Sequence, residues 1–266
     1  MARPSWTRLT GALLGNGCRP PLLGAADVRG STPGWLTVGR VAIVTRGSRG
    51  VGRATVRALA ARGYAVVVNY LHDQPGAESL VEEVLASNGA AVAVRADVAD
   101  ELDVERLFGE TISAFSAVDA VVHTVRARAV PTQLAEVGLG DLDALCRLNT
   151  RAVLIVDREA ARWLRHGGSI VNLSSSCRGT ASRGYGAYAA STAATDVLTR
   201  SLALELRARN ITVNAVAVGI DEAAVPHRIA EFIAYLLSAD GHQLTGQVIF
   251  SDEVDGRGPP LVHRPS

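Results

Sequence analysis

Two hydroxyl side chains give the first indication of chemistry in this chain. Tyr188 stands thirteen positions after Ser175, the spacing of a serine and a tyrosine that exchange a proton with a substrate oxygen. Such a relay needs a lysine four positions after the tyrosine, where this chain has Thr192. All 27 basic residues are arginines, so no other residue of the chain could supply the missing ammonium group.

A glycine-rich segment is the second candidate for chemistry. Residues 45–52 read Thr-Arg-Gly-Ser-Arg-Gly-Val-Gly and lie between an apolar run and a segment of helical period. Glycines in such a turn let backbone N–H groups and a helix N-terminus face a phosphate without intervening side chains. The motif alone also fits an ordinary strand-to-helix turn, but with the Ser175 to Tyr188 spacing it indicates a dinucleotide site.

Short apolar runs alternate with longer segments of helical period from Arg40 onward. Strands are expected at 41–45, 65–69, 91–95, 120–123, 169–173, 212–218 and 247–250. Helices are expected at about 50–62, 76–88, 101–115, 140–165, 186–209 and 227–238. Runs that are apolar on both faces and joined by crossover helices are typical of parallel sheets. The sequence therefore predicts an α/β fold, a single doubly wound, Rossmann-type sheet of seven parallel strands flanked by helices.

Both ends of the chain differ from this pattern. Residues 1–39 are rich in Pro, Gly, Arg and Ser and contain one acid, Asp27. We expect a disordered extension there, with an organelle transit peptide or a start site placed too far upstream as alternatives. The folded domain is expected over 40–252, followed by a Gly/Pro-rich tail over 253–266.

Composition argues against several classes of protein. The net charge of +1, with arginines scattered among acids, gives no basic face for nucleic acid. No apolar run reaches the length of a membrane span. Three cysteines far apart and six histidines without ligand spacing argue against a disulfide framework and a metal site. We therefore expect a cytoplasmic protein that acts on small molecules or binds other proteins.

Over about residues 40–252 the chain resembles the classical short-chain dehydrogenase/reductase (SDR) family. That family has a nucleotide loop T-G-x-x-x-G-x-G and an active-site Ser followed by Y-x-x-x-K. The matching elements occur in the family's order: the loop at 45–52, Asp97-Val98, Asn149, SIVNLSSS at 169–176, Tyr188, and VNAVAVG at 213–219. The resemblance is to a divergent member, because the lysine of the family motif is absent.

The resemblance implies catalytic roles for four positions. Tyr188 would be the general acid to a carbonyl, Ser175 would polarise that carbonyl, and Asn149 would hold the water chain behind the lysine. A nearby cation lowers the pKa of a tyrosine from about 10 by about one to three units. Thr192, which replaces the lysine, is neutral, so we expect weakened turnover. Arg178 and Arg183 lie between Ser175 and Tyr188 and are expected to be solvated rather than to replace this charge.

The resemblance also implies a nicotinamide dinucleotide site. Its residues would be Thr45, Gly47, Ser48, Arg49, Gly50, Gly52, Asn69, Asp97, Val98, Gly219 and Ile220. The second strand ends in Asn69 rather than in an acid, and Arg49 could pair a 2'-phosphate, so NADP(H) is favoured over NAD(H).

Two arginines argue against tight binding of that cofactor. Arg46 replaces the first glycine of the loop, and Arg126 ends a segment, His123-Thr124-Val125-Arg126, where the family carries N-N-A-G. Both long side chains are expected in space that glycine leaves open for the nucleotide. His123 is expected to be a structural residue rather than a new acid or base.

Two functional hypotheses remain open at the level of sequence. The first is an NADP(H)-dependent oxidoreductase that reduces a carbonyl, or oxidises an alcohol in reverse, with low activity. The second is an inactive homologue that serves as a partner subunit or nucleotide-binding scaffold. The short segment after Gly219 favours the second, because the family has a substrate-covering lid there. By resemblance, the helices at 140–165 and 186–209 would form a homodimer or homotetramer, and a lysine-bearing hetero-subunit is an alternative.

Overall fold

The computed structural model describes residues 39–127, 130–176, 183–219 and 226–251. Its contacts divide the chain into residues 1–36 and 37–266, and all the described residues belong to the second unit. The expectations for residues 1–38 and for the tail at 253–266 therefore lie outside the described residues. So do those for Arg178 and Ile220.

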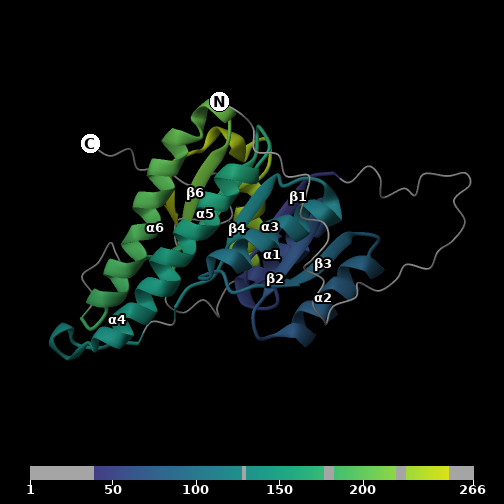
Figure 1. Ribbon diagram of the computed structural model, residues 1–266. Coiled ribbons are helices and arrows are strands. Elements are labelled where there is room, and N and C mark those ends of the chain that lie inside the picture. The colour runs from purple at the N-terminus through teal and green to yellow at the C-terminus, as the bar shows by residue number, and fades with distance from the viewer. Residues whose placement is uncertain (1–38, 128–129, 177–182, 220–225, 252–266) are drawn as a thin grey trace, which may run out of the picture. The chain divides into compact units, whose positions relative to one another are not determined.

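Seven parallel strands form one sheet in the order β3-β2-β1-β4-β5-β6-β7 (Figure 1). The strands are β1 (Val41–Val44), β2 (Ala65–Tyr70), β3 (Ala90–Arg95), β4 (Ala120–His123), β5 (Ser169–Ser175), β6 (Thr212–Val218) and β7 (Val248–Phe250). The predicted fold class is confirmed. The strand order reverses between β1 and β4, and the carboxyl ends of strands at such a point are where ligands bind in this architecture.

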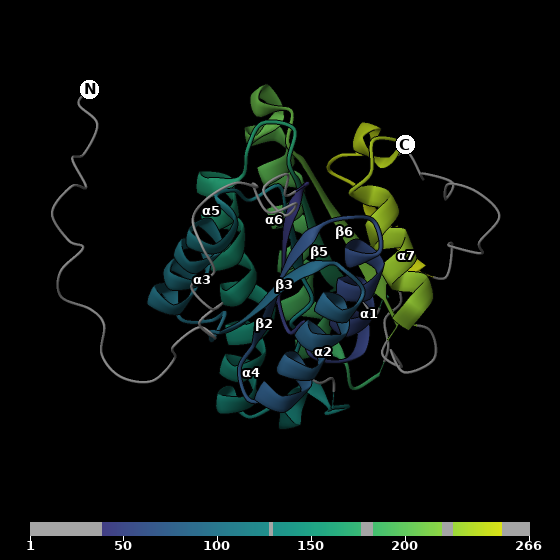
Figure 2. The ribbon, with the colours of Figure 1, turned by 90° about the vertical axis from the view of Figure 1, so that its right-hand side faces the viewer.

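Helices cover both faces of the sheet (Figure 2). They are α1 (Gly50–Ala60), α2 (Gln74–Ala86), α3 (Glu101–Phe115), α4 (Leu139–Cys146), α5 (Ala152–Trp163), α6 (Gly186–Glu205) and α7 (Pro226–Leu236). On one face, helices α1, α2 and α7 form a hydrophobic core with strand residues that include Val44 and Val122. Helices α3, α5 and α6 pack on the other, together with Ile43 and Val121. Successive strand residues therefore face opposite cores, as the apolar runs predict.

The expected helix over 140–165 is interrupted in the structure. Helix α4 ends at Cys146, a π-helical turn occupies Arg147–Arg151, and α5 begins at Ala152. A π-turn inserts an extra residue into the helical ladder and is frequent at functional sites. Asn149, one of the residues singled out from the sequence, lies inside this turn and is buried.

Charged side chains close the amino end of the sheet. The Asp119 carboxylate, 6% exposed, accepts from the backbone N–H of Val41 at 2.7 Å and from two nitrogens of Arg165, each at 2.7 Å. Arg40 donates to the carbonyl of Leu237 at 2.7 Å and to that of Gly167 at 3.4 Å. Backbone groups beyond the last ladder bonds are thereby satisfied, as buried polar groups must be.

Candidate functional site

A crevice lies at the carboxyl ends of the strands around the reversal of strand order. Its cavity measures about 330 Å³. The side chains that line it include Arg46, Ser48, Arg49, Asn69, Asp73, Asp97, Val98 and Arg126. Four of the strand-end loops thus contribute to one cavity, and five of the eleven residues expected to bind a dinucleotide line it: Ser48, Arg49, Asn69, Asp97 and Val98.

The glycine-rich loop is folded tightly against the start of α1. Gly47 donates its N–H to the carbonyl of Asn69 at 2.8 Å, and Arg46 donates its N–H to Asn69 Oδ1 at 3.2 Å. A Cβ on Gly52 would lie 2.3 Å from the carbonyl oxygen of Arg46, so no side chain fits there. Arg46 has a φ of 48°, a left-handed conformation that favours glycine. The loop keeps the glycine-loop geometry, with an arginine in the strained position.

Thr45 connects the first strand to the fourth. Its hydroxyl accepts from the N–H of Thr124 at 2.9 Å, and its carbonyl accepts from the Thr124 hydroxyl at 2.5 Å. The ring Nδ1 of His123 lies 3.3 Å from the same Thr45 hydroxyl. His123 is fully buried, which disfavours its charged form and lowers its pKa to about 4. His123 is therefore a neutral structural residue near pH 7, as expected.

An acid that sequence reasoning missed lies beside Arg49. Asp73, just before α2, accepts from Arg49 Nε at 3.1 Å and lines the same cavity. The pKa of Asp73 is lowered, first by a hydrogen bond from Ser48 and then by Arg49. The positive charge expected to meet a 2'-phosphate is thus shared with a carboxylate. The available signal was an acid shortly after the second strand, four positions past Asn69.

Asp97 lies at the other side of the crevice, also paired with an arginine. Its carboxylate accepts from Arg147 at 2.7 Å and from the N–H of Ala99 at 3.0 Å. Burial alone would raise the pKa of Asp97, but these hydrogen bonds outweigh it and the pKa is lowered. Val98 is buried next to it and lines the cavity.

Tyr188 and Thr192 lie one turn apart on α6, and both are buried. The Thr192 hydroxyl lies 3.2 Å from the carbonyl of Tyr188 and 3.1 Å from that of Ala189. Its single proton is therefore directed to its own helix, in the way threonines within helices commonly bond. Ser175 is the last residue of β5 and pairs with Val218, the last residue of β6. Gly219 directly follows Val218 in the chain.

The side chain nearest to replacing the lysine comes from the loop after β4. Arg126 Nη1 lies 3.5 Å from the Tyr188 hydroxyl, 3.0 Å from the carbonyl of Ser174 and 3.5 Å from that of Val218. The arginine expected to obstruct the cofactor thus places its guanidinium beside the phenol. Arg183, considered from the sequence for this charge, is exposed.

Asn149 joins this loop to α6. Its Oδ1 accepts from the N–H of Ala127 at 2.8 Å, and its Nδ2 donates to the Ser191 hydroxyl at 2.9 Å. That hydroxyl in turn donates to the carbonyl of Tyr188 at 2.8 Å. The π-turn therefore positions both the residue that follows Arg126 and the start of the helix that carries Tyr188.

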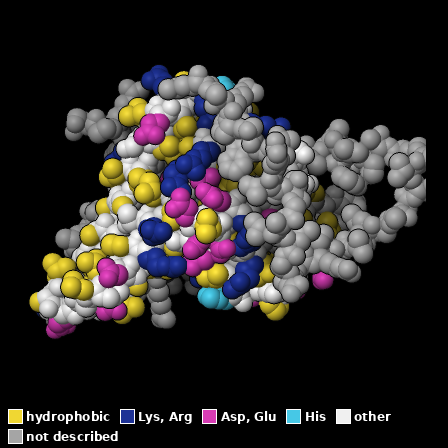
Figure 3. Space-filling model, in the orientation of Figure 1, with side chains coloured by type: hydrophobic (Ala, Val, Ile, Leu, Met, Phe, Trp, Pro, Cys, Tyr) yellow, Lys and Arg dark blue, Asp and Glu magenta, His cyan; other side chains and the backbone are white. Residues whose placement is uncertain are grey.

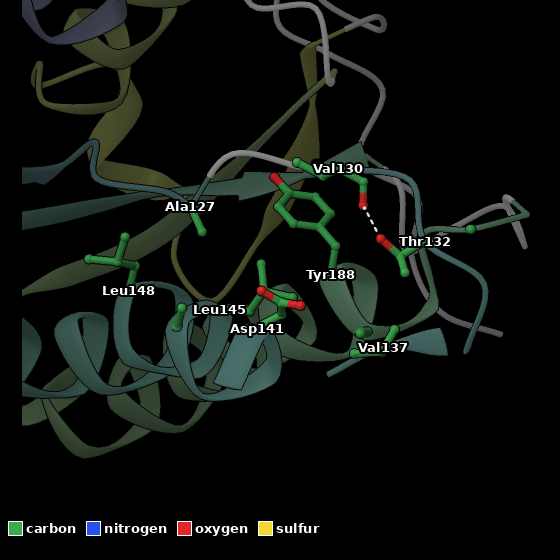
Figure 4. Close-up of a pocket in the computed structure, with 11 residues that line it drawn as sticks. Ala127, Val130, Thr132, Val137, Asp141, Leu145, Leu148 and Tyr188 are labelled. Atoms are coloured by element: carbon green, nitrogen blue, oxygen red, sulfur yellow. Dashed lines mark hydrogen bonds between the residues drawn. The ribbon is translucent and has the colours of Figure 1, made fainter. Parts of the chain in front are cut away.

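A second cavity of about 400 Å³ adjoins the Tyr188 ring. It is lined by Ala127, Val130, Thr132, Val137, Asp141, Ala144, Leu145, Leu148, Gly184, Ala187 and Tyr188. Figure 4 shows the ring projecting from α6 between the loop residues Ala127 and Val130 and, across the cavity, Asp141 of α4. The lining is mainly apolar, and Asp141 is its one charged side chain among the described residues. Such a cavity suits a mainly apolar small molecule.

Comparison with known proteins identifies the family. The family model described as "Enoyl-(Acyl carrier protein) reductase" matches residues 46–225. A 3-oxoacyl-[acyl-carrier-protein] reductase of Synechocystis sp. is 36% identical over 182 residues, 68% of this chain and 73% of that protein. Versicolorin reductase 1 of Aspergillus parasiticus is 38% identical over 184 residues, 68% of this chain and 69% of that protein. The chain belongs to the short-chain dehydrogenase/reductase family, as its motifs predicted.

A solved structure supports the same assignment. The crystal structure of a blue fluorescent protein from a metagenomic library, in complex with NADPH, is 32% identical. It superposes with a TM-score of 0.74 over 80% of this chain and 96% of that one. None of the helices in the described ranges is long and apolar enough to cross a membrane.

Proposed function

We propose that this protein is an oxidoreductase that uses NADP(H) to reduce a carbonyl group, or to oxidise an alcohol in reverse. The observation that carries the proposal is the position of Tyr188. Its ring lines the apolar cavity, and its hydroxyl faces Arg126, which also lines the crevice at the strand ends, called the nucleotide crevice below. A carbonyl in the cavity beside the Tyr188 ring and a hydride donor in the crevice at the strand ends would meet near this hydroxyl. The names of the relatives, both reductases, support the direction of the reaction.

The residues present fit the cofactor. A Cβ on Gly47 or Gly52 would lie 3.0 or 2.3 Å from a backbone oxygen nearby in the chain, so these glycines let the loop turn tightly into α1. Helix α1 begins at Gly50 and has no acid in its first turn. Backbone N–H groups at such a helix start suit a pyrophosphate. NADPH, when bound, supplies the hydride. Arg49 supports a preference for NADP(H) over NAD(H), because its guanidinium could exchange the ion pair with Asp73 for one with the 2'-phosphate.

The chain's own residues would handle the proton. As hydride adds to the carbonyl carbon, the oxygen becomes an alkoxide and takes the proton from the Tyr188 hydroxyl. Ser175, at the end of β5, would donate a hydrogen bond to that oxygen and polarise it before transfer. Without the lysine at position 192, this step would be weakened unless another cation stands beside the phenol, because general acid catalysis is worth about 10²- to 10⁴-fold.

The test is NADPH oxidation by purified protein with activated, mainly apolar ketones. We expect NADPH binding by calorimetry and measurable turnover, with kcat falling about 10²-fold or more in Tyr188→Phe. NADPH should bind that variant as well as it binds the wild type, because the phenol oxygen is not part of the phosphate site. Failure of the wild type to bind any nicotinamide dinucleotide would contradict the proposal.

An inactive homologue remains the second candidate, and the geometry of Thr192 favours it. Because its hydroxyl is directed to the carbonyls of α6, this position offers neither charge nor a free proton to a ribose. Such a protein would act as a partner subunit or a nucleotide-binding scaffold. Tight NADPH binding without turnover, in the wild type and in Thr192→Lys, would support it.

We also propose that a second copy of the chain packs on α5 and α6. Large apolar side chains stand exposed there: Leu154 (50%) and Trp163 (42%) on α5, and Val197 (61%) and Leu204 (74%) on α6. Figure 3 shows mostly uncharged side chains over α6, beside a band of charged ones. Light scattering should find a dimer or tetramer of this protein, and Val197→Glu should dissociate it. Leu102→Glu on α3, where Leu102 is 73% exposed, is the matched control.

A further inference from the structure

We propose that Arg126 supplies the cation for the Tyr188 proton relay, in place of the lysine that α6 lacks. This inference rests on the proposed function, in which Tyr188 is the proton donor. The positive charge would then come from the loop after β4, whereas the family motif places it on the helix of the tyrosine, four positions later in the chain.

The contact between the two side chains is the first observation. Arg126 Nη1 lies 3.5 Å from the Tyr188 hydroxyl oxygen, the atom that gives up the proton. The same residue lines the nucleotide crevice. Arg126 therefore lies between the cavity for the hydride donor and the phenol, the two places that a relay cation must serve.

Arg126 is held both at its guanidinium and at the backbone that follows it. The carbonyls of Ser174 and Val218, at the carboxyl ends of β5 and β6, accept from Nη1 at 3.0 and 3.5 Å. The next residue, Ala127, donates its N–H to Asn149 Oδ1 at 2.8 Å. Strand ends on a rigid sheet and a buried amide thus fix the position of Arg126, as precise catalysis requires.

The charge acts on the product of proton transfer. When the O–H bond of Tyr188 breaks, its proton forms the O–H bond of the new alcohol and its electron pair remains on the phenolate oxygen. An arginine guanidinium stays charged, so it would stabilise this phenolate through a charge-assisted hydrogen bond. The short, neutral Thr192 is consistent with this arrangement, because a lysine there would place a second positive charge beside the first.

The experiment compares Arg126→Ala and Arg126→Lys with Arg40→Ala as the matched control. Arg40 also bonds two backbone carbonyls, but at the amino end of the sheet. We expect Arg126→Ala to lose about 10²-fold in kcat for NADPH-dependent reduction, and Arg126→Lys to retain part of it. Arg40→Ala should lower the melting temperature while its kcat stays near that of the wild type.

Chemical rescue separates a catalytic charge from a structural side chain. Guanidinium ion, added well below denaturing concentrations, should raise kcat of Arg126→Ala at least about tenfold, with potassium chloride at equal ionic strength as the control. It should not raise kcat of Tyr188→Phe, which lacks the acidic proton.

The outcomes distinguish the two proposals. If Tyr188→Phe loses activity but Arg126→Ala keeps the wild-type kcat, the role of Arg126 is overturned and the proposed function stands. Higher activity in Arg126→Ala would also overturn it, because the guanidinium would then obstruct the site. If the wild type shows no turnover, or Tyr188→Phe is as active as the wild type, both proposals fail.

Discussion

The two ends of the sheet use the same residue types in opposite ways. At the amino end, Arg40 and Arg165 meet backbone carbonyls and a buried carboxylate, Asp119, at 2.7 Å. At the carboxyl end, Arg46 holds a left-handed φ of 48°. There too, Nε2 of the buried His123 has no hydrogen-bond partner among the described residues. One end is satisfied and the other is strained.

This contrast separates the end of the sheet that stabilises the fold from the end that carries the proposed site. Strain and unsatisfied polar groups persist only where the surrounding structure holds them, and they concentrate at functional sites. Substitutions at the amino end should therefore change stability without changing ligand binding. Substitutions at the carboxyl end should change ligand binding without lowering stability, and some should even stabilise the fold.

The largest expected effect is on acid stability through His123. The unfolded chain takes up a proton at this residue below about pH 6.5, whereas the folded protein does so only near its lowered pKa of about 4. Stability from a neutral His123 is thus present above pH 6.5 and lost as the pH falls to about 4, by about 3 kcal/mol. Urea unfolding of the wild type and of His123→Asn, across this range, measures the difference.

Asp157 has the opposite effect on stability as the pH changes, so only the difference in free energy of unfolding between the wild type and His123→Asn isolates His123. Burial raises the pKa of Asp157 to about 7, so its contribution is present below its ordinary value of 3.8 and is lost as the pH rises through 7. This contribution is common to both proteins and cancels. If the free energy of unfolding of His123→Asn does not rise relative to that of the wild type as the pH falls, the account of His123 as a buried imidazole that resists protonation is wrong.

Asp119→Ala should give the next largest effect, at the amino end. It leaves the N–H of Val41 without its acceptor and Arg165 without its partner, which we expect to lower the free energy of unfolding by about 2–3 kcal/mol. Denaturant unfolding measures the loss, and calorimetry should find unchanged NADPH affinity. Glu101→Ala, which breaks the exposed pair with Arg158, is the control, at about 1 kcal/mol or less. Weaker NADPH binding in Asp119→Ala would break the distinction between the two ends.

Arg46→Gly tests the strain at the carboxyl end. A left-handed arginine costs about 1–2 kcal/mol, and glycine removes this cost while adding some entropy to the unfolded chain. We expect a net stabilisation of up to about 1 kcal/mol, measured by urea unfolding. Asn88→Gly, at a φ of 58°, is the control with little expected change, because asparagine tolerates this conformation. A destabilised Arg46→Gly protein would show that the loop stores no strain.

The smallest effect concerns the choice of cofactor. Asp73→Asn removes the carboxylate that pairs with Arg49, so we expect NADPH affinity to rise about two- to fivefold relative to NADH. Competitive titration of both nucleotides measures this ratio. Glu83→Gln, which disrupts the ion pairs with Arg53 and Arg57 between α1 and α2, serves as control. A shift toward NADH in Asp73→Asn would contradict the role given to Arg49.

Much of the fold was predictable from the sequence. The seven apolar runs matched strands to within one or two residues, because parallel strands buried on both faces leave a local signal. The π-turn at Arg147–Arg151 could not be predicted, since one extra residue in a helical ladder barely alters the apolar period. The expected continuous helix over 140–165 was wrong for this reason.

The candidate site was predictable only in part. The glycine loop and Tyr188 belong to short motifs, and the sequence identifies them directly. The contact of Arg126 with Tyr188 joins residues 62 positions apart through the sheet, and the direction of its side chain depends on carbonyls of two other strands. Asp73 was missed for a related reason, because its pairing with Arg49 forms only when the two loops meet.

Introducing Thr192→Lys separately into the wild type and into Arg126→Ala tests the central claim most directly. If Arg126 already supplies the charge, kcat for NADPH-dependent reduction should rise about 10²-fold in the Arg126→Ala background but change little in the wild type. An equal gain in both backgrounds would contradict the account, because the two positions would then act independently.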